Sequence, residues 1–132
     1  MDEILNFVKE IENEIINYRR ELHKIPEVGL NLPQTKNFLI NELKKINLDI
    51  KEYNSCSGIS TIIGKKDGKI LAIRSDMDGL PIVEETNLSF SSRNQNMHAC
   101  GHDGHMAIIL GVAKTLKKFE DRLNGKVKLI FQ

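Results

Sequence analysis

Apolar residues recur every three or four positions in the first part of the chain, a spacing that predicts an amphipathic helix. The stripe has charged residues between its members and consists of Ile4, Val8, Ile11, Ile15, Tyr18 and Leu22. Pro26 is expected to end this helix, because proline disfavours helical backbone in the residue before it. Pro33 suits the first turn of a second helix. Four apolar residues of that helix are expected to face inward: Phe38, Leu39, Leu43 and Ile46.

Two segments in the middle of the chain have the pattern of strands. Leu48–Tyr53 is the weaker candidate of the two. Residues 58–64 alternate between apolar and polar positions and put Ile59, Thr61 and Ile63 on one side. This alternation predicts a strand with one buried face.

A further apolar run, Ile70–Ile73, is interpreted as a strand buried on both faces. Asp67-Gly68 lies between this run and the preceding strand, which predicts a β-hairpin that pairs the two. Residues 126–131 alternate as a final strand, after a break at Leu123-Asn124-Gly125. Between these strands, apolar residues at helical spacing predict a helix that begins just after residue 105: Ile108, Ile109, Val112, Leu116 and Phe119.

The last three predicted elements are therefore a strand, a helix and a strand. In a crossover of this kind, the carboxyl ends of the strands and the amino end of the helix gather at one edge of the sheet. Asp76 and Asp78 follow the first strand, residues 100–105 precede or open the helix, and Gln132 ends the last strand. We expect all of them to lie at one edge of an α/β sheet.

Composition narrows the class of protein. The chain has 132 residues, the size of one domain, with 40% hydrophobic and 28% charged residues. A net charge of +1 gives no indication of nucleic acid or an anionic membrane as a partner. No window approaches the ~20 apolar residues that span a bilayer, and the acidic start Met1-Asp2-Glu3 does not resemble a secretory signal. Two cysteines make no disulfide framework, so a cytoplasmic location is expected.

The segment from residue 98 to residue 105 holds the densest chemistry in the chain. Five potential metal ligands lie within it: His98, Cys100, His102, Asp103 and His105. Imidazole, thiolate and carboxylate are donors that zinc and neighbouring metals prefer, so the density favours a transition-metal site over a loop of solvated histidines. Cys100 and His102 are two positions apart, which in an extended segment puts both side chains on one side.

Other interpretations of these residues stay open. Cys100 could act as a nucleophile with His98 or His102 as its base, although the number of further donors favours metal binding. Asp76 and Asp78 could supply a metal ligand or a carboxylate that orients a ligating histidine. Taken alone, an Asp-x-Asp sequence is more often a turn or a helix cap.

Three residues or segments outside this cluster are interpreted as structural. His23 lies near a helix end, where capping or packing is expected. Arg74 is expected to pair with an acidic neighbour, with a position near an anionic substrate as the alternative. Residues 84–96 are interpreted as a polar connection that leads to the cluster.

Three motifs in this order carry a family resemblance: residues 20–29 (Arg-Glu-Leu-His, then Pro-Glu-Val-Gly), residues 74–81 (Arg-Ser-Asp-Met-Asp-Gly-Leu-Pro) and residues 97–106 (Met-His-Ala-Cys-Gly-His-Asp-Gly-His-Met). With them the sequence resembles the amidohydrolase branch of the co-catalytic zinc carboxypeptidase and aminoacylase superfamily. That branch includes N-acyl-amino-acid amidohydrolases, hippurate hydrolases and plant indoleacetyl-amino-acid hydrolases. The resemblance implies a zinc-peptidase-like α/β fold, with a mixed sheet flanked by helices.

The resemblance also implies an activity and a set of site residues. The activity is hydrolysis of the amide bond of N-acyl amino acids, with two divalent metal ions, zinc or manganese, in the complete site. Cys100 and His102 match metal ligands, and Asp78 matches the carboxylate that orients a ligand. Asp76 stands where the wider superfamily has a ligating histidine, so it is a possible ligand. Two other positions of the signature are possible ligands without an assigned role: Asp103 and His105.

One departure concerns the end of the sequence. Relatives continue after the Phe-Gln at the final strand with Pro-Ala-Glu-Glu, which supplies the general base and a further metal ligand, whereas this sequence ends at Gln132. Residues 1–132 are therefore expected to form the N-terminal part of the catalytic domain, without the rest of that domain or the lid and dimerisation domain. The full-length relative is expected to be a homodimer. The chain alone is expected to be inactive or incomplete, and a stand-alone metal-binding module is the alternative.

Overall fold

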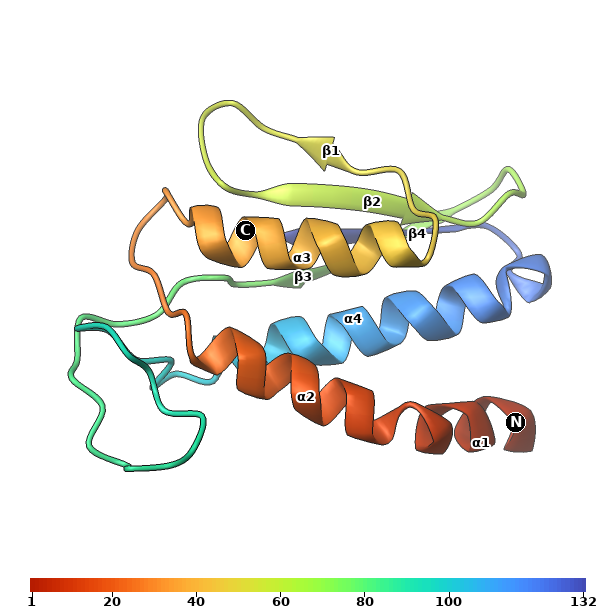
Figure 1. Ribbon diagram of the computed structural model, residues 1–132. Helices are drawn as coiled ribbons and strands as arrows, with labels where there is room; N and C mark the ends of the chain where they lie inside the picture. Colours follow the sequence, from red (N-terminus) through yellow and green to blue (C-terminus); the bar gives the residue numbers. More distant parts are fainter.

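The computed structural model describes all 132 residues, which form four α-helices, one short 3-10 helix and four strands (Figure 1). The helices are α1 (Asp2–Glu10), α2 (Glu12–His23), α3 (Pro33–Lys45), α4 (His102–Lys118) and the 3-10 helix η1 (Glu120–Arg122). The strands are β1 (Lys51–Glu52), β2 (Ile59–Ile63), β3 (Ile70–Ser75) and β4 (Lys126–Phe131). The α/β class predicted from the sequence is therefore confirmed.

The four strands form one mixed sheet in the order β1-β2-β4-β3. β4 runs antiparallel to β2 and parallel to β3, with Ile73 opposite Leu129 and Ser75 opposite Phe131. The chain leaves β3, passes through α4 and returns as β4, which is the predicted strand–helix–strand crossover. The carboxyl end of β3 and the amino end of α4 therefore lie at the same edge of the sheet.

The predicted hairpin at Asp67-Gly68 is wrong. The chain does reverse direction there, but β4 lies between β2 and β3 and pairs with both of them. The connection passes around the start of β4, where the Lys126 N–H donates a hydrogen bond of 3.0 Å to the Lys69 carbonyl. A turn sequence predicts a reversal of the chain, and it carries no information on a strand inserted from later in the sequence.

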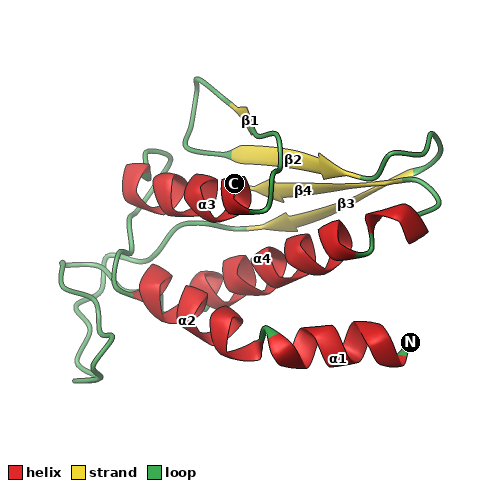
Figure 2. Ribbon diagram, turned by 45° about the vertical axis from the view of Figure 1, so that its right-hand side comes forward, coloured by secondary structure: helices red, strands yellow, loops and turns green.

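The predicted burial of Ile70–Ile73 on both faces is also wrong. Ile70 is 58% exposed and Leu71 is 63% exposed. β3 is an outer strand of the sheet, and the helices lie on one side of the sheet only (Figures 1 and 2). An apolar run of this length therefore reaches solvent, because neither a further strand nor a second helical layer covers it in these 132 residues.

The N-terminal helical stripe is present, but a break at Ile11 divides it into α1 and α2. Ile11 itself is buried, whereas Ile4 and Val8 on α1 stay partly exposed. α4 lies between the sheet and α2, so the molecule has a sheet layer and two successive helical layers on one side (Figure 2). None of the helices has the length and apolar character needed to cross a membrane.

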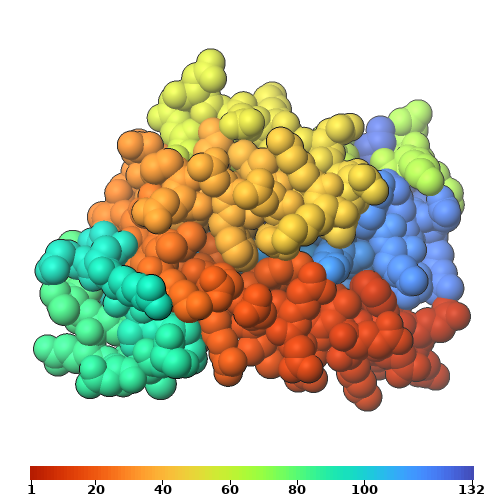
Figure 3. Space-filling view, in the orientation of Figure 1, coloured from red at the N-terminus to blue at the C-terminus, as the bar shows by residue number.

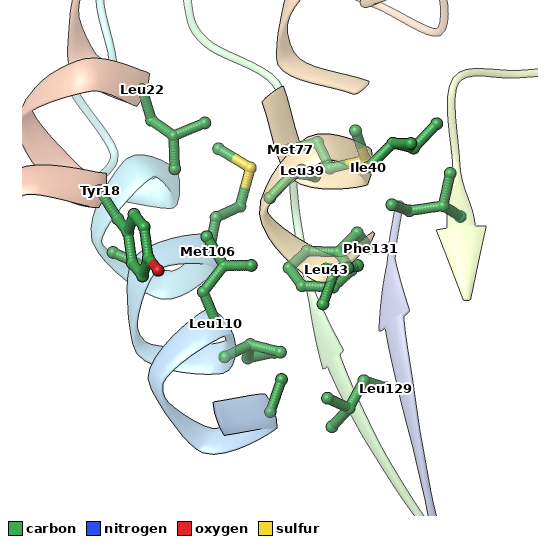
Figure 4. Packing of buried hydrophobic residues seen from close by; sticks show 14 of the residues in the cluster. Tyr18, Leu22, Leu39, Ile40, Leu43, Met77, Met106, Leu110, Leu129 and Phe131 are labelled. Atoms are coloured by element: carbon green, nitrogen blue, oxygen red, sulfur yellow. The ribbon is translucent and has the colours of Figure 1, made fainter. Parts of the chain in front are cut away.

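The core lies between α2, α3, α4 and the covered face of the sheet (Figure 4). Its labelled members come from all of these elements: Tyr18, Leu22, Leu39, Ile40, Leu43, Met77, Met106, Leu110, Leu129 and Phe131. The inward positions predicted for Leu39 and Leu43 are confirmed, as is the buried side of β2, formed by Ile59, Thr61 and Ile63. Met77 is fully buried just after β3 and anchors the segment that follows this strand.

The segment between β3 and α4 folds back against the end of α2. Leu80 and Met97 close its base, with each N–H donating a hydrogen bond of 2.9 Å to the other carbonyl. Residues 82–96 form a lobe beside α2 (green to teal in Figure 3). The Asn94 side chain donates a hydrogen bond of 2.9 Å to the Pro26 carbonyl, which ties this lobe to the chain just after α2.

Glu84 is the charged anchor of this lobe. Its side chain is only 1% exposed and accepts hydrogen bonds from the Ser92 N–H at 2.6 Å, from His23 Nε2 at 3.0 Å and from the Thr86 hydroxyl. Burial alone would raise the pKa of Glu84, but these hydrogen bonds outweigh it and hold the pKa at about 2. The carboxylate is therefore charged over the whole physiological pH range.

Gly64 should not tolerate a side chain. Its φ is +119°, and an added Cβ would lie 2.4 Å from the Gly125 carbonyl oxygen. We expect Gly64→Ala to lower the free energy of unfolding by about 2–5 kcal/mol, from backbone strain together with overpacking. Gly104→Ala in α4 is the matched control, because an added Cβ there meets nothing within 4 Å. The control should gain roughly 0.5–1 kcal/mol in urea unfolding; equal effects of the two variants would contradict the structure.

Glu84→Gln should change the pH dependence of stability. The folded pKa is about 2 and the unfolded value about 4.5, so the stabilisation is complete above pH 4.5 and is lost as pH falls toward 2. We expect wild type to exceed Glu84→Gln by on the order of 2–3 kcal/mol at neutral pH, with this gap closing below about pH 4. Glu85→Gln is the control, because the exposed Glu85 carboxylate makes no hydrogen bond. If wild type and Glu84→Gln differ in unfolding free energy by the same amount at pH 7 and pH 3, ionisation of Glu84 is not the cause of the difference.

Candidate metal centre

Two aspartates stand at the carboxyl end of β3, on either side of the buried Met77. The Ser75 hydroxyl donates to the Asp76 carbonyl at 2.8 Å, and the Gln132 N–H donates to the Ser75 carbonyl at 2.9 Å. Burial of Met77 leaves the Asp76 and Asp78 side chains at the surface of this edge. Asp76 pairs with Arg74 at 2.7 Å, the ion pair expected for this arginine.

His102 is the first residue of α4 and faces Asp78. Its Nδ1 lies 2.9 Å from the Asp78 carbonyl oxygen and 3.0 Å from Asp78 Oδ1. Both partners are acceptors, so Nδ1 carries the proton and Nε2 presents its lone pair. Nε2 makes no hydrogen bond; the nearest carboxylate oxygen, Asp76 Oδ2, is 3.9 Å away. A carboxylate on one imidazole nitrogen and a free second nitrogen is the arrangement of an oriented metal ligand.

Cys100 lies two residues before His102, in a different backbone from the one predicted. Gly101 between them has φ 87° and ψ 19°, so the segment turns through a left-handed residue and is not extended. The same-side placement that an extended segment would give this pair therefore does not apply. The Cys100 thiol is exposed and forms no hydrogen bond with His98 or His102. Neither histidine is placed as a base for a cysteine nucleophile.

The remaining donors of the cluster point in different directions. Asp103 is fully buried; its Oδ2 lies 2.7 Å from His23 Nδ1 and forms an ion pair with Arg19 Nε at 2.9 Å. His98 is buried, and neither ring nitrogen has a protein hydrogen-bond partner; burial lowers the pKa of this imidazole. His105 is exposed, with its ring centre 5.9 Å from that of His102. Asp103 thus faces the interior, away from the exposed carboxylates of Asp76 and Asp78.

These residues fit a divalent metal in part. The His102 Nε2 and the exposed Cys100 thiol are two free donors, and Asp78 orients the imidazole. No three His, Cys, Asp or Glu side chains in the chain are grouped so that they could hold a metal ion. Zinc takes four ligands in a structural site and at least three protein ligands in a catalytic one. The chain supplies part of such a set.

Sequence reasoning missed the surroundings of His23 and Glu84. His23 was expected to cap or pack a helix, and the structure buries it between Asp103 and Glu84 instead. One signal was present, because Arg19 and His23 are four positions apart and therefore share a face of α2. That spacing marks a polar patch on a helix that packs against α4, while the carboxylate partners are 80 and 61 residues away in sequence.

Comparison with known proteins tests the family resemblance. Residues 72–132 match peptidase family M20/M25/M40. The N-acyl-L-amino acid amidohydrolase of Geobacillus stearothermophilus is 38% identical over 99% of this chain and 36% of its own length. The N-acetyldiaminopimelate deacetylase of Priestia megaterium is 46% identical over 92% of this chain and 32% of its own length.

A solved structure agrees with these relatives. The Bacillus subtilis YXEP protein, described as a dinuclear metal binding peptidase from the M20 family, superimposes with a TM-score of 0.88. It is 39% identical, and the match covers 94% of this chain and 35% of the other. The resemblance and fold expected from the three motifs are confirmed. The match to peptidase family M20/M25/M40 thus lies in residues 72–132, and the chain spans about a third of the length of these relatives.

Proposed function

We propose that this chain supplies the first donors of a two-metal site that hydrolyses the amide bond of N-acyl amino acids. The observation that carries the proposal is the His102–Asp78 pair at the carboxyl end of β3, with a free Nε2 and Cys100 two residues away. The names of relatives, an amidohydrolase and a deacetylase, support the substrate class.

Each residue has a distinct part in this proposal. Cys100 and His102 would hold the metal, and Asp78 keeps the proton on His102 Nδ1 so that Nε2 stays available. A divalent metal, when bound, polarises the amide carbonyl and activates water. Thiolate and imidazole together favour zinc over manganese, which prefers oxygen ligands. Asp76, paired with Arg74, and His105, exposed beside His102, are candidates for a secondary contribution.

Several parts of a complete enzyme lie outside what these residues supply. No carboxylate at this edge is free to serve as a general base, because Asp78 is bound to His102 and Asp76 to Arg74. Dimerisation, the cytoplasmic location and the absence of nucleic acid and membrane partners stay predictions. The cysteine-dependent alternative has no support in the geometry, because Cys100 has no histidine hydrogen-bonded to it.

Metal binding by the chain should depend on Cys100 and His102. We expect weak binding of zinc or cobalt in equilibrium dialysis, with Cys100→Ser and His102→Gln each at least about tenfold weaker. Asp78→Asn should lower the affinity by about 10–100-fold, because it removes the carboxylate that orients the imidazole. Cys56→Ser is the matched control, and it should bind as wild type does. Equal uptake by wild type and Cys100→Ser would reject the ligand assignment, and tight stoichiometric binding would favour a stand-alone metal-binding module.

The chain alone should not turn over N-acyl amino acids. A positioned general base contributes roughly 10²–10⁴-fold to such a reaction, and no free carboxylate is placed for that part. The measurement is release of free amino acid from acetyl- and benzoyl-amino acids with added zinc, manganese or cobalt. Chelator-sensitive turnover near that of the Geobacillus stearothermophilus relative would show that a base lies within these residues.

A chimera gives the positive test of the same proposal. Residues 1–132 replace the aligned segment of the Geobacillus stearothermophilus amidohydrolase, which then supplies the remainder of its own chain. We expect chelator-sensitive hydrolysis by this chimera and loss of turnover when Cys100→Ser is introduced. The Cys56→Ser chimera is the control. A folded chimera that is inactive, or one that is indifferent to Cys100→Ser, would contradict the proposed function.

A further inference from the structure

His23 connects three separate parts of the chain through one buried imidazole. It ends α2, and its side chain is 3% exposed. Nδ1 lies 2.7 Å from Oδ2 of Asp103 in the first turn of α4, and Nε2 lies 3.0 Å from Oε1 of Glu84 in the lobe after β3. Both ring nitrogens therefore face carboxylate oxygens.

Each of the two carboxylates that contact this imidazole has a second polar partner. Glu84 also accepts a hydrogen bond from the Ser92 N–H, and Asp103 Oδ2 also forms an ion pair with Arg19 Nε at 2.9 Å. His23 and Arg19 together place polar partners against the two buried carboxylates, which is the condition for burying such groups.

Asp103 is the inward anchor of the first turn of α4. The turn begins after Gly101, in the left-handed conformation, and contains Gly104, which has no side chain to pack. His102 and His105 reach the surface, so Asp103 is the buried residue of this turn. Its Oδ1 has no protein hydrogen-bond partner, and the whole anchoring contact therefore passes through Oδ2, to His23 and Arg19.

Asp103 directly follows His102, so the two residues fix the turn from opposite sides. Asp78 holds His102 at the exposed edge, and His23 holds Asp103 in the interior. Successive helix residues are rotated by about 100° around the axis. A change in the Asp103 contact would rotate the turn and move the His102 imidazole relative to Asp78.

We propose that His23 is a positioning residue for the metal centre: its imidazole holds Asp103 through Nδ1 and thereby sets the orientation of His102 at the start of α4. The inference rests on the proposed function for the identity of the metal site. Arg19 is the weaker holder of Asp103, because its side chain is 42% exposed and also lies over the Phe90 ring. Glu84 holds His23 from the other side and keeps Nδ1 directed at Asp103.

A matched pair of substitutions separates the two contacts of His23. The amide nitrogen of asparagine comes near the place of imidazole Nδ1, and that of glutamine near the place of Nε2. His23→Asn therefore keeps a donor toward Asp103 and loses the one toward Glu84, and His23→Gln does the reverse. Each variant loses one buried hydrogen bond, so a purely structural role of His23 predicts similar losses of metal affinity.

The readout is cobalt binding by the whole chain, followed through the absorption of the thiolate–cobalt bond. Circular dichroism and thermal unfolding establish that each variant is folded at the temperature used. We expect His23→Gln to bind cobalt about tenfold or more weakly than His23→Asn, the size seen for residues that support a metal ligand. Equal affinities of the two folded variants, or tighter binding by His23→Gln, would overturn the proposal.

A metal-free measurement separates this inference from the proposed function. Absence of cobalt binding by the wild type would count against the proposed metal centre alone. In ¹⁵N-labelled wild-type chain, the Nδ1–H proton of His23 should exchange slowly with solvent, because it is buried against Asp103. A rapidly exchanging Nδ1–H proton on His23 would refute the contact with Asp103, even if neither variant folds. With folded variants, the His102 ring signals should shift in His23→Gln more than in His23→Asn; the reverse order would refute the positioning role.

Discussion

The parallel pairing of β3 with β4 is the constraint on which the arrangement of the candidate site depends. Two parallel strands need a crossover between them, so the chain that leaves β3 must return along the length of the sheet before β4 begins. α4 is that return, and it starts at the edge where β3 ends. Asp78 and His102 are 24 residues apart in sequence and meet at 3.0 Å for this reason. Strand direction therefore brings these two residues to the same edge of the sheet, and the contact between them forms there.

The same sheet is covered unequally. α4 and the helices behind it bury one face, and β3 forms an outer edge where Ile70 and Leu71 are exposed. A strand with unpaired backbone groups and apolar side chains is a surface that natural proteins normally protect. The chain spans about a third of the length of its relatives, so this exposure belongs to the described 132 residues and need not persist in a longer protein.

Local patterns in the sequence predicted what is local in the structure. The apolar spacing located α3 and α4, and the alternation over 58–64 identified the buried side of β2. The order of the predicted elements also placed Asp76, Asp78 and residues 100–105 at one edge of the sheet. The strand order could not be predicted in this way, because the Asp67-Gly68 turn carries no sign that β4 will insert beside β2.

Contacts between distant charged residues were beyond sequence reasoning for a different reason. His23, Glu84 and Asp103 each have an ordinary structural interpretation as a cap, a loop residue or a member of a ligand cluster. Their common role appears only when α2, α4 and the lobe pack together, over separations of 80 and 61 residues. The geometry of Cys100 and His102 was missed in a similar way, since an i, i+2 spacing has one meaning in extended backbone and another around a left-handed Gly101.

The first turn of α4 carries two histidine–carboxylate pairs, and burial gives them opposite capacities. Asp78 and His102 lie at the surface, so one nitrogen is oriented by the carboxylate and the other faces open space with its lone pair. His23 is buried between two carboxylates, so both of its ring nitrogens are occupied and neither can bind a metal. A buried pair in which both ring nitrogens are occupied is rigid, whereas the exposed pair keeps one ring nitrogen free. The interior pair can therefore hold the helix turn in place, and only the exterior pair is left to bind a ligand.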